Sequence, residues 1–449
     1  MKKVIALGFI LVLCIFLAFF VFASGGKDDK GKVADKGPEP VELVVWWWGE
    51  SEAPGLEAWM NETVAMFEAE YPHIDVETLL QAVDNVIDDF TTASAAGSPP
   101  DVQFLWNGVY HQENVWRGYL EPLNNLLTPE ELKHMYATDL SIYKGQQYRI
   151  GWYVVPFGMV YNRELFKQAG LSDPPELWEW DDFIDACEQL KRAGITPLGF
   201  GFKDGWWGEW YTALTIYQQA DEIEDIAKLI TGENKWTNPR WHEHWKRAYQ
   251  LIEAGYVNDD ANSLAHYQGI ELFNADKVAM STTVGSLVGE AEKSLGAENV
   301  GLTNFPRFGT GSFRDLPLTD IQGWGVSAQS KHKEEATEFL RFMHRPDRLS
   351  AQFKMANVFP ADDRWQGEKE ITNPNIKLMW KWFKGGSAVY LPNMIPWTFD
   401  SEVMFTAPQF FMSGTHTPEG VGQLAEDVMG RWREENPDLY ESMKIWFNL

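Results

Sequence analysis

The sequence predicts an α/β fold, because short apolar runs of strand length alternate with longer segments that have the apolar spacing of amphipathic helices. The length of 449 residues leaves room for two or three domains of roughly 150 residues each. Hydrophobic residues make up 45% of the chain and charged residues 23%, which excludes collagen-like, disordered and polytopic membrane proteins. The chain also contains 22 Trp, more than its 15 Tyr, and a core rarely needs so many indole rings.

The alternation of strands and helices begins early in the chain. Residues 41–46 (VELVVW) form an apolar run too short for a helix, so they are predicted as a buried strand. Residues 56–67 carry apolar side chains at helical spacing, and a Tyr-Pro pair then ends the helix. Residues 74–80 (IDVETLL) and 101–106 (DVQFLW) are predicted as further strands. This order predicts α/β units around mostly parallel sheets.

The middle of the chain repeats the pattern. A helix is predicted over residues 183–190, with Cys187 on its buried stripe as a small core residue. Further short strands are predicted at residues 277–281, 299–305 and 323–327. A helix with apolar residues facing inward follows at residues 336–343, and the last hundred residues are expected to be mostly helical.

The first 23 residues have the features of an export segment. Two lysines precede an unbroken apolar run from residue 4 to residue 23, which suits either a cleaved signal peptide or a retained N-terminal anchor. Residues 24–40 are polar, rich in Gly and Lys, and lack aromatic side chains, so we expect a flexible tether. Both alternatives place the rest of the chain outside the cytoplasm, in the periplasm or the extracellular space, with membrane tethering through the apolar segment left open.

The charge of the chain argues against two kinds of partner. The formal net charge is −27, and without residues 1–23, which hold two lysines and no acid, it becomes −29. Such an acidic surface repels phosphate backbones and anionic lipid, so we expect neither a nucleic acid nor a membrane surface as partner. Cys187 is then the only cysteine, so no intrachain disulfide can form.

Sequence motifs for metal, phosphate and nucleophilic chemistry are not found. The segment Trp241-His242-Glu243-His244-Trp245 lacks the spacing of the His-Glu-x-x-His zinc helix, and a helix packing its two Trp explains it better. No phosphate-binding loop and no Gly-x-Ser-x-Gly motif occurs. We therefore expect no metal, no cofactor and no catalytic residue. A glycoside hydrolase stays open, because its two carboxyl groups need no local motif.

Several Trp residues stand where predicted strands end, and this placement suggests a binding site. In open α/β sheets, ligands bind at the carboxyl ends of strands. Indole rings can stack on the C–H faces of a sugar ring, while polar groups at the rim bind its hydroxyls. The Trp residues concerned are Trp46, Trp47, Trp48, Trp106, Trp152, Trp206, Trp207, Trp324 and Trp397. Polar side chains beside them are Glu50, Asn107, Asp320 and Gln322.

The chain resembles the extracellular solute-binding proteins of ABC sugar importers, of the maltose-binding type. The resemblance covers about residues 41–449 and rests on six segments in the family's order. They are VELVVWWWGE, PPDVQFLWNG, YVVPFGMVYNRELFKQAGL, WEWDDFIDACEQLKRAGITPLGFG, FNADKVAMSTTVGS and DIQGWGVSAQSKHKEEATEFLRFM. The resemblance implies a two-lobed periplasmic-binding-protein fold (type II), with the ligand cleft between lobes joined by hinge crossings.

The resemblance also implies lobe boundaries and ligand contacts. Lobe 1 is expected to comprise residues 41–154 and 305–356, and lobe 2 residues 155–304 and 357–449. The substrate-binding residues implied are Trp48, Glu50, Trp106, Asn107, Trp152, Trp206, Trp207, Gly285, Ser286, Asp320, Trp324 and Trp397. Trp206→Ala and Trp324→Ala are expected to cut sugar affinity with little loss of fold.

The function expected from these observations is transport rather than catalysis. We expect a monomeric, non-enzymatic protein that binds a carbohydrate and delivers it to the membrane subunits of an ABC permease by hinge closure. The many Trp residues favour an oligosaccharide as this ligand. The alternatives are a secreted glycoside hydrolase and a binding protein for a polyol, a polyamine or a peptide.

Overall fold

The computed structural model describes residues 39–135 and 138–448. The fold below is that of the unit that begins at residue 40. The predicted export segment (1–23) and nearly all of the predicted tether (24–40) lie outside the described residues. Within the described part of the chain, no helix is long and apolar enough to cross a membrane.

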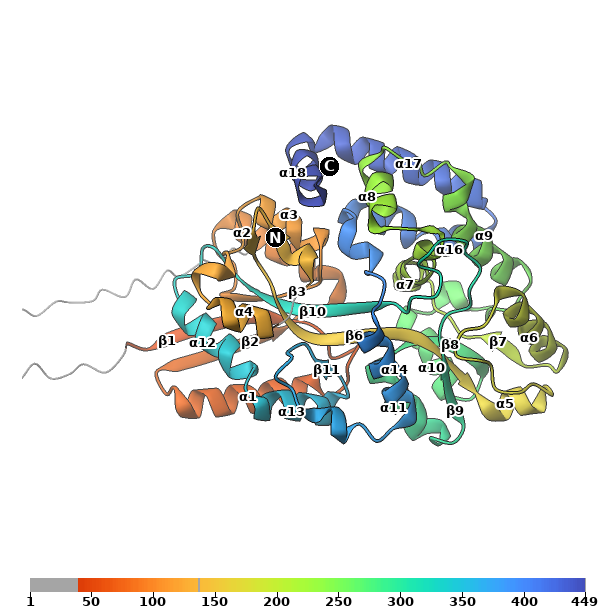
Figure 1. Cartoon of the computed structure of the whole chain (residues 1–449), viewed down its shortest axis with the longest axis horizontal. Coiled ribbons are helices and arrows are strands. Elements are labelled where there is room, and N and C mark those ends of the chain that lie inside the picture. The colour runs from red at the N-terminus through yellow and green to blue at the C-terminus, as the bar shows by residue number, and fades with distance from the viewer. Residues whose placement is uncertain (1–38, 136–137, 449) are drawn as a thin grey trace, which may run out of the picture. The chain divides into compact units, whose positions relative to one another are not determined.

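Among the described residues, nine strands form one sheet, in the order β2-β1-β3-β10-β6-β8-β7, with β9 and β11 also paired to β6 (Figure 1). Their bounds are β1 Val41–Trp47, β2 Ile74–Leu80, β3 Val102–Leu105, β6 Ile150–Asn162, β7 Thr196–Leu198, β8 Val278–Val284, β9 Val300–Thr303, β10 Thr319–Val326 and β11 Phe359–Pro360. A separate hairpin consists of β4 Ile142–Tyr143 and β5 Gln146–Gln147. The strands predicted from the sequence are therefore present, and the α/β class is confirmed.

Helices separate most of the strands, singly or in runs of up to four, and after β11 they follow one another. Those before β8 are α1 Leu56–Glu70, α2 Val86–Ala96, α3 Val109–Trp116, α4 Pro129–His134, α5 Arg163–Gln168, α6 Trp180–Arg192, α7 Trp206–Ile216, α8 Ile223–Thr231, α9 Pro239–Glu253 and α10 His266–Asn274. Those after β8 are α11 Gly285–Leu295, α12 Lys333–Met343, α13 Pro346–Ala356, α14 Pro374–Gly385, α15 Trp397–Phe399, α16 Ala407–Ser413, α17 Pro418–Glu435 and α18 Pro437–Phe447.

The sheet is mixed rather than mostly parallel, which corrects the expectation from the sequence. β1 pairs in parallel with β2 and β3, and β7 pairs in parallel with β8. The central strands β10 and β6 are antiparallel to each other and to their neighbours. The reason is connectivity: β10 arrives from a remote part of the chain, and local alternation of strands and helices does not predict its direction.

Strand β6 connects the two parts of the sheet. All thirteen of its residues are buried, as expected for a strand covered on both faces. Its first half, residues 150–156, pairs with β10, and its second half, residues 157–162, pairs with β8 and β9. In Figure 1 the strand runs from the side of the sheet that holds β1 to β3 toward the side that holds β7 and β8. The change of partners falls close to residue 154, where the first segment of the predicted lobe 1 ends.

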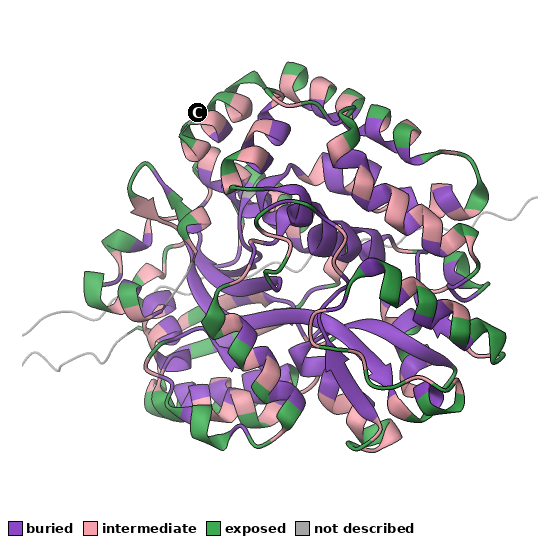
Figure 2. Cartoon of the chain, turned by 45° about the vertical axis from the view of Figure 1, so that its right-hand side comes forward, coloured by how far each residue is buried: buried purple, intermediate pink, exposed green. Residues whose placement is uncertain are grey.

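Amphipathic helices cover the sheet. Figure 2 shows the strands almost wholly buried, while the outer turns of the surrounding helices are exposed. Helix α1 buries Leu56, Trp59, Met60, Thr63 and Phe67, the stripe expected from its periodicity. Helix α7 differs, because all of its eleven residues are buried. A helix enclosed on every side can present polar residues to an interior space, and α7 does so at the site described below.

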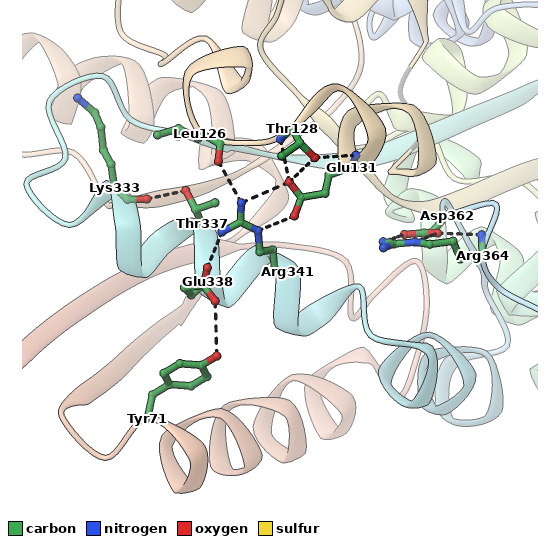
Figure 3. A network of polar contacts seen from close by, with 10 residues as sticks. All are labelled: Tyr71, Leu126, Thr128, Glu131, Lys333, Thr337, Glu338, Arg341, Asp362 and Arg364. Atoms are coloured by element: carbon green, nitrogen blue, oxygen red, sulfur yellow. Dashed lines mark hydrogen bonds and ion pairs between the residues drawn. The ribbon is translucent and has the colours of Figure 1, made fainter.

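A polar network fixes the outer helices α12 and α4 (Figure 3). Arg341 on α12 donates to Glu131 on α4 at 2.6 Å and to the main-chain oxygen of Leu126 at 3.3 Å. Glu131 also completes a capping box with Thr128 at the start of α4. The hydrogen bond from Arg341 holds the pKa of Glu131 down at about 2. Because these side chains are partly exposed, their contribution to stability is modest.

Candidate functional site

A small interior cavity of about 30 Å³ lies where the loops after β1 and β3 meet helix α7 and the start of β10. This volume is well below that of a typical small-molecule site, so a ligand of sugar size requires the walls to move apart. Aromatic and acidic side chains dominate its walls. The lining residues are Trp48, Glu52, Val83, Trp106, Phe157, Trp206, Glu209, Trp210, His266, Tyr267, Asp320, Gln322 and Tyr390.

Three indole rings form a continuous wall of the cavity. The ring centroids of Trp48 and Trp106 are 5.3 Å apart, and those of Trp106 and Trp206 are 6.2 Å apart. The planes of Trp106 and Trp206 are inclined by 35°. Trp206 is oriented by its Nε1, which donates to Asp84 at 3.1 Å. These rings are held by neighbours on several elements, so the wall exists without a ligand.

Glu52 and Gln322 form the polar part of the opposite wall. The Oε1 of Glu52 accepts from the Tyr153 hydroxyl at 2.9 Å and from Nε2 of Gln322 at 3.2 Å. Burial raises the pKa of Glu52 from 4.5 to about 8, because removal from water disfavours the charged form. The negative charge of Asp320 raises it further, against the two hydrogen bonds. Glu52 is therefore largely protonated in the empty cavity near neutral pH.

Two more carboxyl groups border the same space. The Oδ1 of Asp320 accepts from Nδ2 of Asn393 at 2.6 Å, and Glu209 is bonded to Tyr390. Burial raises the pKa of both carboxyl groups, and for Glu209 the charges of Asp320 and Glu52 add to this effect. The Oε2 of Glu209 has no hydrogen-bond partner among the described residues. The cavity thus offers flat aromatic faces together with acceptor-rich polar groups.

The His, Cys, Asp and Glu side chains of the described residues do not form a metal site. Across residues 39–135 and 138–448, no group of three or more His, Cys, Asp and Glu side chains is placed to hold a metal ion. His242 and His244 are buried on α9, and Nε2 of His242 lies 2.7 Å from the main-chain oxygen of Trp236. These two histidines belong to the packing of the helix.

The structure brings four of the predicted site residues to the cavity: Trp48, Trp106, Trp206 and Asp320. Two others stand directly behind its walls. The ring of Trp397 lies 6.2 Å from that of Trp206, and the Ser286 hydroxyl donates to the main-chain oxygen of Glu52. These two residues position lining residues without lining the cavity themselves.

Three predicted residues have local structural roles instead. The carboxylate of Glu50 accepts from the amides of Gly55 and Glu57 at 2.9 and 2.6 Å, and so satisfies main-chain donors at the start of helix α1.

Asn107 is buried, and its Oδ1 accepts from Thr138 at 2.7 Å and from Arg149 at 2.8 Å. Gly285 opens α11, where a Cβ would meet the Met379 sulfur at 3.3 Å and Pro156 at 3.6 Å.

The remaining three, Trp152, Trp207 and Trp324, lie in the core and not at the cavity. The rings of Trp152 and Trp324 are 4.5 Å apart, and Trp324 is fully buried. Trp207 packs on Phe200 at 4.5 Å and on Tyr211 at 4.9 Å. The burial of Trp324 argues against the expectation that it can be removed with little loss of fold, because its ring is surrounded by other side chains.

Some lining residues were missed although the sequence contains a signal for them. Glu209 and Trp210 follow Trp206 by three and four residues on α7, so they share its helix face. Gln322 was not missed, since it is among the polar side chains noted beside the strand-end Trp residues; it follows Asp320 by two residues on β10 and lies on the same face of the strand. Glu52, His266, Tyr267 and Tyr390 carry no comparable signal, since long-range packing brings them together.

The wall that contains Tyr390 and Asn393 depends on close backbone contact at Gly108. Gly108 has φ of 78°, and a Cβ there would lie 1.3 Å from the main-chain oxygen of Asn393. Gly108→Ala is expected to lower the free energy of unfolding by roughly 2–4 kcal/mol, from backbone strain and overpacking together. Urea denaturation measures this loss.

Gly118→Ala is the matched control for this substitution. Gly118 also has a positive φ, 76°, but a Cβ there would meet nothing within 4 Å. Its cost is expected to stay near 1 kcal/mol. Equal losses for the two variants would contradict the steric argument.

Comparisons with known proteins show what the chain is similar to. Residues 49–347 match the family model described as bacterial extracellular solute-binding protein. The chain is 23% identical to the multiple sugar-binding protein of Streptococcus mutans, over 76% of this chain and 78% of that protein. It is 26% identical to the diacetylchitobiose binding protein of Streptomyces coelicolor, over 79% of each.

A solved structure, a chitin oligosaccharide binding protein, superposes with a TM-score of 0.80 at 22% identity. The match covers 87% of this chain and 98% of the other. At this identity the likeness shows the fold alone. It confirms the fold class predicted from the sequence, a two-lobed α/β fold of the periplasmic-binding-protein type.

Proposed function

We propose that this chain, which belongs to the family of bacterial extracellular solute-binding proteins, binds a carbohydrate in the cavity lined by Trp48, Trp106 and Trp206 and delivers it to the permease of an ABC importer. The family is extracellular, so the protein is exported, to the periplasm or the cell exterior. The observation that carries the proposal is the continuous indole wall facing buried carboxyl and amide groups.

The chemistry of this cavity suits a sugar for two reasons. Indole faces stack on the C–H faces of a pyranose ring, while Glu52, Asp320 and Gln322 can exchange hydrogen bonds with its hydroxyls. Relatives give independent support, since the two curated proteins named above bind multiple sugars and diacetylchitobiose according to their names. The family and these relatives are binding proteins, which favours binding over hydrolysis here.

The row of rings favours a ligand of more than one sugar unit. Trp48, Trp106 and Trp206 follow one another along the wall at centroid spacings of 5.3 and 6.2 Å. An oligosaccharide can stack on several of them, whereas a monosaccharide covers one or two.

Closure around the ligand is the proposed mode of action. Trp48 and Trp106 come from residues 41–154, the predicted lobe 1, whereas Trp206 and Glu209 come from residues 155–304, the predicted lobe 2. A ligand that touches residues of both lobes binds the closed conformation better than the open one and shifts the population toward it. The closed form would then be recognised by the permease.

Trp206→Ala is expected to weaken carbohydrate binding about 30-fold or more, since a central aromatic contact of a binding site commonly contributes at this level. A thermal-shift screen over mono- and oligosaccharides, polyols, polyamines and peptides first identifies the ligand, because ligand binding raises the melting temperature. Calorimetric titration of the variant with that ligand then measures the loss.

Trp380→Ala serves as the control for the loss of an indole ring. Trp380 is half-buried, packs on Phe359 at 4.9 Å and does not line the cavity. This variant should retain the wild-type affinity. Unchanged affinity of Trp206→Ala would contradict the proposed site, and a screen in which no carbohydrate raises the melting temperature would contradict the proposed function. Recovery of the ligand intact after incubation distinguishes binding from hydrolysis.

A further inference from the structure

The geometry of the cavity points to an amino sugar, a carbohydrate that carries a positively charged amino group, as the ligand of this protein. The inference rests on the proposed function and narrows its ligand class. Three carboxyl groups, those of Glu52, Glu209 and Asp320, converge on one enclosed aromatic space.

The balance of charge around the cavity is one-sided. Among the described residues that line it, three are acids and none is Lys or Arg. Arg149 does not line the cavity, but its positive charge lowers the pKa of Asp320. The Arg149 guanidinium donates to Asn107 and to the main-chain oxygen of Ile321. His266 adds no positive charge, because burial lowers its pKa to about 3. An ammonium group on the ligand would supply the counter-charge that allows a neighbouring carboxyl group to ionise.

Four buried side-chain atoms of the walls have no hydrogen-bond partner among the described residues, two side-chain oxygens and the two ring nitrogens of His266. Glu209 is 3% exposed and Gln322 is 2% exposed, and neither Oε2 of Glu209 nor Oε1 of Gln322 has a hydrogen-bond partner among the described residues. A buried acceptor without a donor is costly, so the ligand is expected to supply donors. An ammonium group carries three donors and no acceptor, whereas a hydroxyl also brings acceptor lone pairs.

The aromatic walls favour the same kind of ligand. Trp48, Trp106, Trp206 and Trp210 present their rings to the space that the carboxyl groups border. The face of an indole attracts cations through its quadrupole, and this attraction grows when the cation is removed from water. Rings and carboxylates around one enclosed space together form a cation site, while the flat faces still accept the sugar ring.

The carboxyl groups themselves give the ammonium an advantage over a neutral substituent. In the empty cavity, burial raises the pKa values of all three groups, so ionisation is costly there. A bound ammonium ion stabilises the ionised form of its neighbour and removes that cost. A hydroxyl or an acetamide group provides no such compensation. The preference therefore comes from a charge pair that only the cationic ligand can complete.

The test compares disaccharides that differ in one substituent. Calorimetric titrations at about pH 6, where the amine is protonated, use the β-1,4 disaccharide of glucosamine, its di-N-acetyl form and cellobiose. The same comparison is made with glucosamine, galactosamine and mannosamine against their N-acetylated and hydroxyl counterparts. At least one amino sugar is expected to bind about tenfold or more tightly than both of its neutral counterparts, as a charge-assisted hydrogen bond implies.

Two variants assign the preference to the carboxyl groups. Glu209→Gln and Asp320→Asn each remove one charge and retain the side-chain shape, so each should reduce the ratio of amino-sugar to neutral-sugar affinity about tenfold. Glu42→Gln, which removes an exposed carboxyl on β1, should leave this ratio unchanged.

The outcomes separate this inference from the proposed function. Neutral sugars that bind as tightly as their amino counterparts, or a ratio unaffected by both carboxyl variants, would overturn the inference while leaving carbohydrate binding in place. Binding of spermidine without binding of any sugar would overturn both, since the cation site would then serve a polyamine.

Discussion

Trp324→Ala is expected to lower the free energy of unfolding by about 3–5 kcal/mol, the usual cost of deleting a buried aromatic side chain. Trp324 is fully buried on β10, and its ring lies 4.5 Å from that of Trp152 and 6.2 Å from that of Phe104. Its removal leaves a cavity between two rigid strands that cannot close together. Urea denaturation followed by circular dichroism measures the loss, and a low yield of soluble protein would accompany it.

Two variants separate the stability effect of Trp324 from an effect on binding. Trp324→Phe retains an aromatic ring and should recover most of the lost stability. Trp206→Ala should be less destabilising, because one side of that ring borders the empty cavity. If Trp324→Ala kept the wild-type denaturation midpoint but lost ligand affinity, the ring would be a ligand contact and its placement in the core would be contradicted.

Glu52→Gln is expected to flatten the pH dependence of stability between about pH 5 and pH 8. The pKa of Glu52 is raised from 4.5 to about 8 in the folded protein, so the folded state binds more protons than the unfolded state over this range. The free energy of unfolding therefore decreases as the pH rises through it, by up to about 1.4 kcal/mol per pH unit from this group. The full contribution is on the order of 4 kcal/mol between pH 5 and pH 8.

The measurement is the difference between the variant and the wild-type protein, without ligand, at each pH. Other groups such as Glu131 titrate in both proteins, so only the difference isolates Glu52. Glu52→Gln should be about as stable as the wild type at pH 5 and clearly more stable at pH 8. Glu42→Gln, on the exposed face of β1, should show a small difference that does not vary with pH. A constant difference for Glu52→Gln as well would mean that Glu52 is not buried with a raised pKa.

Local patterns in the sequence were sufficient for most elements. The strand predicted at residues 74–80 is β2 with the same bounds, and the helical stripe from residue 56 is the buried face of α1. In both cases, burial on one face imposes a period of two or 3.6 residues that is visible in the chain. Strand direction was not predictable in this way, since β10 reaches β6 from more than 150 residues away.

The same reasoning predicted some residues of the candidate site and misplaced others. Trp48 and Trp106, which follow strands, line the cavity. Trp207 lies in the core, although Trp206, the residue before it, lines the cavity. Consecutive residues of a helix point about 100° apart, so position at an element's end does not decide which ring meets the cavity. Helical spacing from Trp206 identifies Glu209 and Trp210 instead.

The α/β class, the order of elements and the family resemblance follow from the amino-acid sequence, which also shows an excess of Trp that composition does not explain. Only the folded structure shows which Trp residues belong to the core and which line the cavity. Trp59, Trp152 and Trp324 are among those in the core, and a smaller set lines one cavity. It also decided the chemistry of Glu52, whose raised pKa depends on Tyr153, Asp320 and Gln322, residues 101 to 270 positions away. Periodicity is a local property of the chain, whereas burial and the proximity of charges are properties of segments that only the folded protein brings together.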